Sequence, residues 1–267
     1  MIQRIAELLN AEGIELFSPI SLSFCNIKKE YLLRAEGILG GTAIMLAVPY
    51  LSREAIGASL SAYAVARDYH LYFRELFARI LPVLREEFPK NRFCGFSDHS
   101  PIDERDAAAR SGIGIIGKNG LLITEKYSSF VFIGEIITDA ELPCSLSEPV
   151  SCEDCGACYA ACPMREGTEC LSAVTQKKGE LSPAEAEYIR KYGSRWGCDI
   201  CQNVCPHTKR AINSGEIFTK IPFFCEKLLP RPTADDILSM DNAEFSERVY
   251  SWRGRECILR NIRLLEK

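Results

Sequence analysis

Hydrophobic residues in the first half of the chain recur with two periodicities, which divide it into expected helices and strands. Over residues 2–11 apolar side chains fall on one face at helical spacing, which predicts a helix. The uninterrupted apolar run over residues 43–48 stops at Pro49 and predicts a buried strand. By the same criteria we predict further helices over 28–38, 61–88 (which Pro82 kinks or divides) and 101–111, and strands over 92–97, 121–124 and 130–138.

The pattern changes after residue 139. Prolines at 143 and 149 mark residues 140–150 as a linker, and closely spaced cysteines then replace the apolar periodicity. A helix is predicted over residues 183–192, and Thr233 followed by Asp236 indicates another helix start. We expect a mixed α+β or α/β fold in three parts: an α/β domain over 1–145, a ferredoxin-like cysteine domain over 146–228 and a short helical tail over 229–267.

Composition narrows the cellular setting. The chain begins as an amphipathic helix rather than a signal peptide, and no apolar run reaches the ~18 residues of a membrane span. Thirteen cysteines in such a chain favour metal binding in a reducing cytoplasm over disulfides. We therefore expect a cytoplasmic protein without a membrane partner. Five cysteines fall outside the motif described next, and we expect most of them to be buried: Cys25, Cys94, Cys144, Cys225 and Cys257.

The remaining cysteines form two related motifs. Residues 152–163 read C-x2-C-x2-C-x3-C-P, the spacing of a bacterial two-cluster ferredoxin. Residues 198–206 repeat its end, with the first cysteine displaced to Cys170. Because the cysteine before proline ligates the other cluster in such ferredoxins, the assignment to two 4Fe–4S clusters is crossed. One set is Cys152, Cys155, Cys158 and Cys205, and the other is Cys162, Cys170, Cys198 and Cys201.

Two alternatives to this assignment stay open. Paired C-x2-C motifs also bind zinc, although zinc ribbons need neither the third step nor the Cys-Pro endings. Cys170 is the least certain ligand, because its spacing is irregular, and Cys144 and Cys225 are the substitutes.

A literal G-x-G-x-x-G motif occupies residues 112–117, with Glu135 about 20 residues on, where a dinucleotide fingerprint expects a ribose ligand. That fingerprint must follow a strand and open a helix. Here it follows the expected helix over 101–111 and leads into an expected strand. We therefore favour a helix-ending glycine and a turn.

An ordered set of motifs resembles the epoxyqueuosine reductase family, which is dependent on cobalamin and iron–sulfur clusters. The pieces are A-R-D-Y-H at 66–70, D-H-S-P at 98–101 with E-R at 104–105, the glycine run leading to G-K-N at 117–119, F-V-F-I-G-E-I-I-T-D at 130–139 and the cysteine block. The tail over 245–263, with L-R-N at 259–261, resembles the start of the family's C-terminal helical segment.

The resemblance implies reduction of an epoxide on a modified tRNA base to an alkene, with electrons passing from the clusters to cobalamin. It places the family's general acid on Asp98, which requires a carboxyl group still protonated near neutral pH. Without the resemblance, Asp98 would be interpreted as a helix cap. Asp98, Lys118 and Asn119 are the expected cobalamin contacts, and a solvated turn is the alternative for the last two. An external electron donor such as a flavodoxin or ferredoxin is also implied.

Glu104 receives no catalytic role, and several roles stay open for the histidines. Glu104 is expected to pair with Arg105 or Arg110 on a helix surface. His70 is expected to be structural or to line a pocket rather than to bind cobalt. His99 is expected to tune the acid, contact substrate or face solvent, and His207 to contact a cluster sulfur or face solvent.

Three features depart from the family pattern. The segment between Cys162 and Cys170 is short, the longer helical-repeat tail is missing or reduced, and the net charge is −4. Local basic groups could still bind tRNA, or could be ordinary surface: Lys177, Lys178, Arg190, Lys191, Arg195, Lys209, Arg210, Arg253, Arg255, Arg260 and Arg263. The rival hypotheses are a related reductase of a small molecule and a non-enzymatic electron carrier.

Overall fold

The computed structural model describes residues 1–144, 146–148, 150–166 and 169–266. Contacts divide the chain into two compact units, each formed by several segments. The sheet unit comprises Met1–Pro49, His70–Cys155 and Ser214–Ile217, and the helical unit comprises Tyr50–Tyr69, Gly156–Asn213 and Phe218–Lys267. The functional division at residues 145 and 228 stays a prediction.

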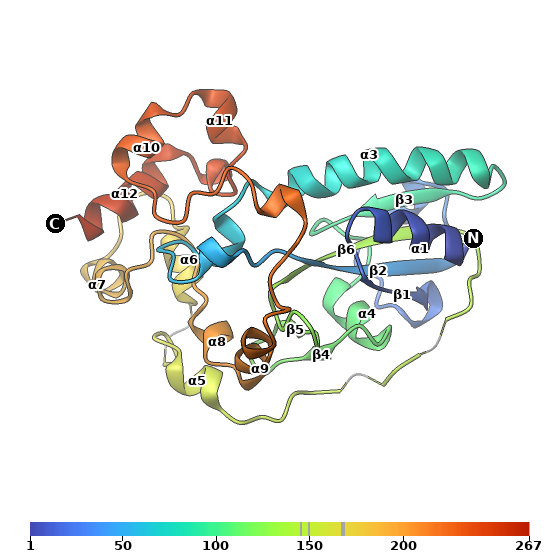
Figure 1. Cartoon of the computed structure of the whole chain (residues 1–267), viewed down its shortest axis with the longest axis horizontal. Helices are drawn as coiled ribbons and strands as arrows, with labels where there is room; N and C mark the ends of the chain where they lie inside the picture. Colours follow the sequence, from blue (N-terminus) through green and yellow to red (C-terminus); the bar gives the residue numbers. More distant parts are fainter. Residues whose placement is uncertain (145, 149, 167–168, 267) are drawn as a thin grey trace. The chain divides into compact units, whose positions relative to one another are not determined.

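The sheet unit is organised around a four-stranded sheet of order β1-β2-β6-β3 (Figure 1). Every neighbouring pair of strands is antiparallel. Of the two predicted classes, this is the α+β fold, because an α/β fold has a mostly parallel sheet. The predicted strands are confirmed. Strand β1 was not predicted, because Pro19 interrupts its hydrophobic pattern. Proline is tolerated there because β1 lies at the edge of the sheet. The strands are β1 (Leu16–Ser21), β2 (Thr42–Pro49), β3 (Phe93–Phe96) and β6 (Val131–Thr138).

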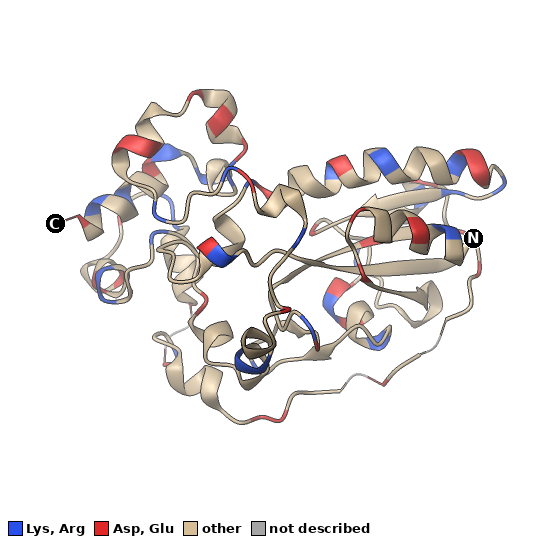
Figure 2. Cartoon of the chain, viewed as in Figure 1, with Lys and Arg blue, Asp and Glu red and all other residues tan. Residues whose placement is uncertain are grey.

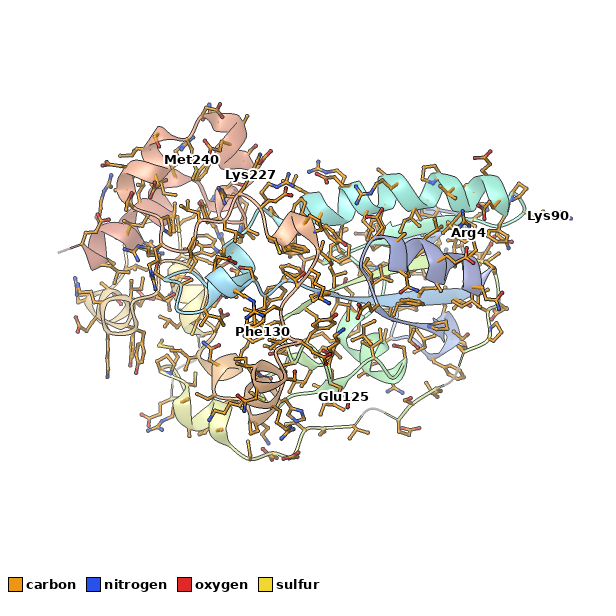
Figure 3. The ribbon with its side chains drawn as sticks, viewed as in Figure 1. Arg4, Lys90, Glu125, Phe130, Lys227 and Met240 are labelled. Atoms are coloured by element: carbon orange, nitrogen blue, oxygen red, sulfur yellow. The ribbon has the colours of Figure 1, made fainter. Side chains whose placement is uncertain are left out.

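Helices cover both faces of this sheet. On one face, α3 (Tyr69–Glu87) packs so closely on the sheet that the strand beneath it has no room for a side chain at Gly134. A Cβ on Gly134 would stand 2.3 Å from the Phe73 ring. Helix α1 (Ile2–Ala11) carries Arg4, which is labelled in Figure 3. Its guanidinium group donates to Glu87, the last residue of α3, at 2.9 Å.

On the other face, the alanines of α4 (Glu104–Arg110) pack against apolar residues of β2, β3 and β6. The short α2 (Glu30–Ala35) contributes Leu33 to the same core, and a two-stranded ribbon joins β4 (Ile115–Ile116) to β5 (Leu122–Ile123).

The long predicted helix over residues 61–88 begins later than expected and is not divided. Helix α3 starts at Tyr69 and runs through Pro82. Upstream, Ala62–Ala64 form only a 3-10 turn, because Ser61 Oγ and the Ala62 N–H both donate to the Asp199 carboxylate of the helical unit. A tertiary contact therefore overrides the local helical periodicity.

The helical unit consists of short helices connected by loops. They are α5 (Ala157–Ala161), α6 (Leu171–Thr175), α7 (Pro183–Tyr192), α8 (Ile200–Asn203), α9 (Pro206–Ser214, whose last residue belongs to the sheet unit), α10 (Ala234–Ser239), α11 (Asn242–Ser246) and α12 (Arg255–Leu265). Further 3-10 turns occur at Leu22–Phe24, Arg53–Ala55, Pro222–Phe224 and Ser251–Arg253.

Two predicted helix starts are confirmed with their caps. Helix α7 has the predicted bounds, and Ser182 and Glu185 form a capping box at its start. Thr233 and Asp236 form the same arrangement before α10. The expected linker over 140–150 has no helix or strand in its described residues, and Pro149 lies outside them. Within the described part of the chain, every helix is too short or too polar to cross a bilayer.

Candidate functional site

Asp98 lies on the loop between β3 and α4, in the left-handed backbone region with φ of 64°. Its backbone N–H donates to Glu104 Oε1 at 2.9 Å, and its Oδ2 lies 3.4 Å from His70 Nε2. The Asp98 side chain is 67% exposed. The protein alone therefore does not supply the burial that an acid role requires, so a covering ligand would have to supply it.

Beneath this loop lie two carboxyl groups. Glu135 on β6 is completely buried and accepts a hydrogen bond from Ser100 Oγ of the loop. Burial raises the pKa of Glu104 to about 7, and burial followed by the nearby Glu104 charge raises the pKa of Glu135 well above its usual value. The expected pairing of Glu104 with an arginine is wrong, because Arg105 donates to the Gly120 carbonyl and Arg110 to Asp106.

This carboxyl pair was missed in the sequence analysis, although a signal was present. Val131, Ile133 and Ile137 alternate along β6 and join one hydrophobic core, and Glu135 falls on the same face. A lone carboxylic acid in such a stripe marks a buried ionisable group.

The three histidines are placed as follows. His70, at the start of α3, contacts Asp98, which is compatible with the expectation that it lines a pocket. His99 Nδ1 lies 3.1 Å from Lys29 Nζ, and His99 Nε2 lies 3.3 Å from the Tyr31 hydroxyl. His207 Nδ1 lies 3.1 Å from an Arg210 nitrogen. His70 is therefore the histidine that contacts the predicted acid, with 3.4 Å between its Nε2 and Asp98 Oδ2.

The glycine run has the predicted context. Gly112 ends α4 with φ of 85°, and Ile115 and Ile116 then form strand β4 rather than opening a helix. Steric contact also explains Gly114, because a Cβ there would lie 2.5 Å from the Ile123 carbonyl oxygen. The run therefore ends a helix and starts a ribbon, and it lacks the strand–turn–helix setting of a dinucleotide site.

Lys118 and Asn119 occupy the turn between β4 and β5. The Lys118 N–H donates to Cys152 Sγ at 3.3 Å, and its ammonium group pairs with Asp154 at 3.1 Å. Asn119 Oδ1 accepts from the Leu121 N–H. This turn therefore contacts the first cysteine of the motif, and binding of cobalamin by its two side chains stays a prediction.

The cysteines of the helical unit gather around two short helices that pack together. Helix α5 carries Cys158 and is followed by Cys162, and it packs against α8. Cys201 lies on α8, between Cys198 and Cys205. Two segments of similar cysteine spacing are thus in contact, as expected for the two halves of a ferredoxin-like motif.

Cys198 lies near two other predicted ligands. Burial raises the pKa of the Cys198 thiol to about 12, and the nearby charges of Cys170, Asp199 and Cys201 add to the increase. All cysteines of the chain are free. Within the described ranges, no three Cys, His, Asp or Glu side chains are arranged to hold a single metal ion. The ligand assignment therefore depends on spacing and on these neighbourhoods.

The expectation for the cysteines outside the motif is only partly confirmed. Cys94 and Cys257 are buried and Cys25 is half-buried, as expected of small hydrophobic residues. Cys144 and Cys225 are exposed, so that the expectation, which was for most of the five, holds for the other three only if half-buried Cys25 is counted.

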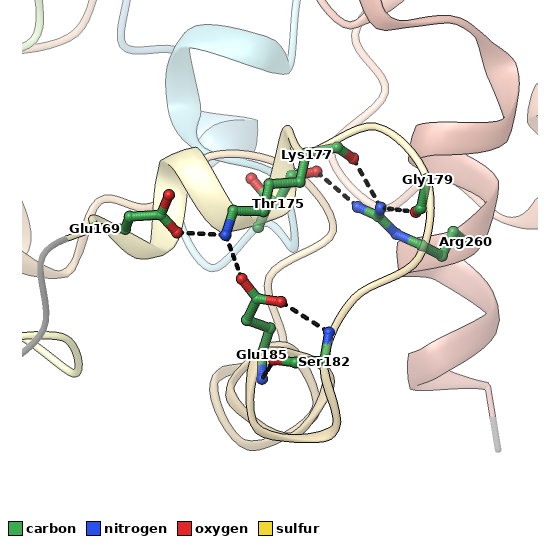
Figure 4. A network of polar contacts seen from close by, with 7 residues as sticks. All are labelled: Glu169, Thr175, Lys177, Gly179, Ser182, Glu185 and Arg260. Atoms are coloured by element: carbon green, nitrogen blue, oxygen red, sulfur yellow. Dashed lines mark hydrogen bonds and ion pairs between the residues drawn. The ribbon is translucent and has the colours of Figure 1, made fainter.

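A polar network holds the segment that follows Cys170 (Figure 4). The Lys177 ammonium group bridges Glu169 and Glu185, and hydrogen bonding to Lys177 lowers the pKa of Glu185 to about 2. Arg260 of α12 donates to the carbonyl oxygens of Lys177 at 2.7 Å and Gly179 at 2.6 Å. The tail is therefore fixed to the loop after α6.

Several predicted tRNA-binding cations are already occupied. Arg255 donates to the carbonyls of Met240 and Asp241, and Arg260 is held as above. Arg263 pairs with Glu256 on the same helix. Charges of both signs occur along α3 and α12 (Figure 2). Together with the partners of the tail arginines, this favours an ordinary charged surface for the tail group.

The fold is that of known reductases. The chain aligns with the epoxyqueuosine reductase of Streptococcus thermophilus at a TM-score of 0.74 and 22% identity, covering 99% of this chain and 80% of that one. The Bacillus subtilis enzyme gives a TM-score of 0.72 at 23% identity, covering 99% and 81%. The fold is therefore shared over nearly the whole chain.

Sequence comparison adds the family. The epoxyqueuosine reductase of Listeria monocytogenes is 33% identical over 95% of this chain and 70% of its own length. That of Bacillus anthracis is 32% identical over 73% of this chain but only 53% of its own length, so that the chain spans about half of that relative. No protein-family model matches. The chain belongs to the epoxyqueuosine reductase family, a family of oxidoreductases, as its motifs predicted.

Proposed function

We propose that this chain is an oxidoreductase that converts the epoxide of epoxyqueuosine, within a tRNA, to the alkene. The balanced change takes up two electrons and two protons and releases water. The observation that carries the proposal is the 33% identity to the Listeria reductase over 95% of this chain. A structurally similar reductase was crystallised with an epoxyqueuosine-modified tRNA stem loop, which supports tRNA as the substrate here.

Two 4Fe–4S clusters on the eight assigned cysteines are part of this proposal. The contact between α5 and α8 and the neighbourhood of Cys170, Cys198 and Cys201 support the assignment. Bound clusters supply one-electron transfer, and the protein supplies thiolates and backbone donors such as the Lys118 N–H at Cys152. The electrons would come from an external flavodoxin or ferredoxin in the cytoplasm.

Cobalamin is the second proposed cofactor, and when bound it supplies a low-valent metal centre that side chains cannot provide. Lys118 and Asn119 would contact its amide groups. The Lys118 side chain is 61% exposed and its ion pair with Asp154 is weak, so that its ammonium group can leave Asp154 and bind a ligand at little cost in free energy.

Asp98 is the proposed proton donor to the epoxide oxygen. It lies on an exposed loop, and the Bacillus subtilis relative has been observed with its aspartate-bearing catalytic loop swung out of the active site. Covering of the Asp98 carboxyl group by substrate would raise its pKa through desolvation, which keeps the acid protonated near neutral pH.

The proposal is tested with protein purified anaerobically and supplied with a chemical reductant. Metal analysis is expected to give about eight irons and one cobalt per chain. Incubation with an epoxyqueuosine-containing tRNA stem loop should yield queuosine, measured by mass spectrometry after digestion. Absence of both product and stem-loop binding at low salt would overturn the tRNA assignment.

A second candidate is a reductase of a small epoxide or related molecule with the same cofactors. The net charge of −4 and the occupied tail arginines favour it. It predicts cofactor loading without salt-dependent tRNA binding, whereas phosphate contacts make tRNA affinity fall steeply with salt. A protein that loads iron but takes up no corrinoid would instead indicate an electron carrier.

A further inference from the structure

We propose that two side chains at the start of α2 hold the loop between β3 and α4 through the imidazole ring of His99. The two are Lys29 and Tyr31, and the loop (residues 97–103) is the one that carries Asp98. This inference goes beyond the proposed function and rests on it only for the role of Asp98. The three side chains act through the loop rather than on the substrate, so that they are positioning residues.

Asp98 is the central residue of a tight and strained turn. The His99 N–H donates to the Ser97 carbonyl oxygen at 2.7 Å, and φ at Asp98 is 64°. A three-residue turn with a positive φ at its centre is rare, because that conformation costs free energy for a residue with a side chain. Such a turn persists only when its surroundings hold it. Glu104 supplies one contact by accepting the Asp98 N–H at 2.9 Å, and the contacts of His99, which closes the turn, therefore also bear on how the acid is presented.

The far end of the loop is joined to the start of α2 through the backbone. The N–H groups of Lys28 and Lys29 donate to the Pro101 carbonyl oxygen, at 2.8 and 3.0 Å. The Asp103 N–H donates to the Asn26 carbonyl oxygen at 2.9 Å. These bonds place the segment beside the loop, so that its side chains reach the ring of the loop histidine from a defined position. Because only main-chain atoms take part, substitution of either lysine side chain leaves the bonds in place.

The side chains of this segment contact both nitrogens of the His99 ring. Lys29 Nζ lies 3.1 Å from Nδ1, and the Tyr31 hydroxyl lies 3.3 Å from Nε2. An ammonium group only donates, so that Nδ1 is the acceptor of a neutral ring. The ring proton is then on Nε2, which donates to the Tyr31 oxygen. A protonated ring would offer Lys29 no acceptor and would place two cations side by side, so that the ring is held in its neutral form.

The carboxyl group of the adjacent Asp98 has another histidine as a partner. Its Oδ2 lies 3.4 Å from Nε2 of His70, on α3. His70 therefore contacts the acid itself, whereas His99 connects the turn to the start of α2. Each contact of the His99 ring is exposed and weak by itself. A strained turn is nevertheless sensitive to weak contacts, because a small gain in free energy decides whether it stays formed.

Hydrogen–deuterium exchange of the full chain at about pH 8, where imidazole is ordinarily neutral, tests this without any activity. Protection is measured on peptides covering residues 97–100 and corrected for intrinsic exchange. Lys29→Met and Tyr31→Phe should each lower it by roughly two- to fivefold, the size expected of an exposed contact. Lys29→Arg keeps a donor and should retain most of the protection. Lys28→Met is the matched control, because it removes the same charge from the same segment, where Lys28 pairs with Asp103 at 3.7 Å, and it should behave as the wild type.

Two further measurements separate a specific contact from a general loss of stability. In a His99→Ala background, Lys29→Met should have no further effect on protection, because its partner is gone. Nitrogen-15 NMR of the ring is assigned by comparison with the His99→Ala spectrum, since the chain has only three histidines. Nδ1 should carry no proton, and its resonance should move in Lys29→Met but not in Lys28→Met.

The same variants are then compared in turnover. His99→Ala should lower kcat by roughly tenfold with little change in KM, because the acid is displaced while substrate binding is kept. Wild-type protection in both Lys29→Met and Tyr31→Phe, an equal loss in Lys28→Met, or a proton on Nδ1 overturns the inference. So does an unchanged kcat of His99→Ala in an active enzyme. If the exchange and NMR results hold but the wild type reduces no epoxyqueuosine, the contacts stand and the proposed function fails.

Discussion

His70 Nε2 lies 3.4 Å from Asp98 Oδ2, so that the first turn of α3 reaches the carboxyl group of the loop after β3. The two residues are 28 positions apart and belong to separate motifs of the family pattern. A protonated imidazole would stabilise the Asp98 carboxylate that remains after proton donation.

Replacement of Asp98 by Asn removes the proposed proton donor while keeping size and the backbone contact to Glu104. Iron and cobalt contents should match the wild type, and turnover should fall by at least about a hundredfold, since general acid catalysis contributes that much. Mass spectrometry of digested tRNA measures the product. His70→Gln should reduce turnover less, and full activity of Asp98→Asn would move the acid elsewhere.

The carboxyl pair predicts a pH dependence of stability. The pKa of Glu104 is raised from 4.5 to about 7 in the folded state, so that its contribution is complete below about pH 4.5 and is lost as pH rises through about 7. The difference amounts to about 3 kcal/mol at most. Denaturant unfolding of wild type and Glu104→Gln between pH 5 and 8 should show a steeper decline in the wild type. Parallel curves would contradict a raised pKa.

Cys170 is predicted to ligate iron, and Cys225 is a matched exposed control. Cys170→Ala should lose one cluster, lowering iron from about eight to about four atoms per chain. Cys225→Ala should keep all of it. The reverse result would identify Cys225 as the substitute ligand, and retention of iron by both variants would leave Cys144 as the candidate.

Arg260 is predicted to stabilise the helical unit rather than to bind tRNA. Its guanidinium group donates to the carbonyls of Lys177 and Gly179. When the arginine side chain is removed, these two carbonyl oxygens can accept hydrogen bonds only from water. Arg260→Ala should lower the free energy of unfolding by about 2 kcal/mol, because hydrogen bonds to charged groups contribute about that much. Arg263→Ala on the same helix loses only an exposed ion pair and should change it little. Equal losses in the two variants would refute the distinction.

Close packing of α3 on the sheet can be tested with a single methyl group. A Cβ on Gly134 would stand 2.3 Å from the Phe73 ring, whereas one on Gly40 would meet nothing within 4 Å. Gly134→Ala should destabilise the protein by about 1–3 kcal/mol through overpacking, and Gly40→Ala should be nearly neutral. Thermal unfolding measures both, and a neutral Gly134→Ala would show that Phe73 can move.

The sequence by itself determined many of the elements, and the family. The apolar run before Pro49 predicted β2, the helical spacing of residues 2–11 predicted α1, and the helix predicted over 183–192 is α7. The ordered motifs identified the reductase family, since they combine local spacing with order along the chain, and both are visible without a fold.

Only the tertiary structure decided which groups meet. Asp98 and Glu104 are six positions apart, but Glu135 in the middle of β6 is distant from both in sequence, so that no local pattern joins it to them. The antiparallel order of the strands and the backbone partners of Arg255 and Arg260 were equally invisible. The reason is physical: periodicity reports how a segment meets the core, whereas pKa values and hydrogen bonds depend on neighbours that the fold brings together.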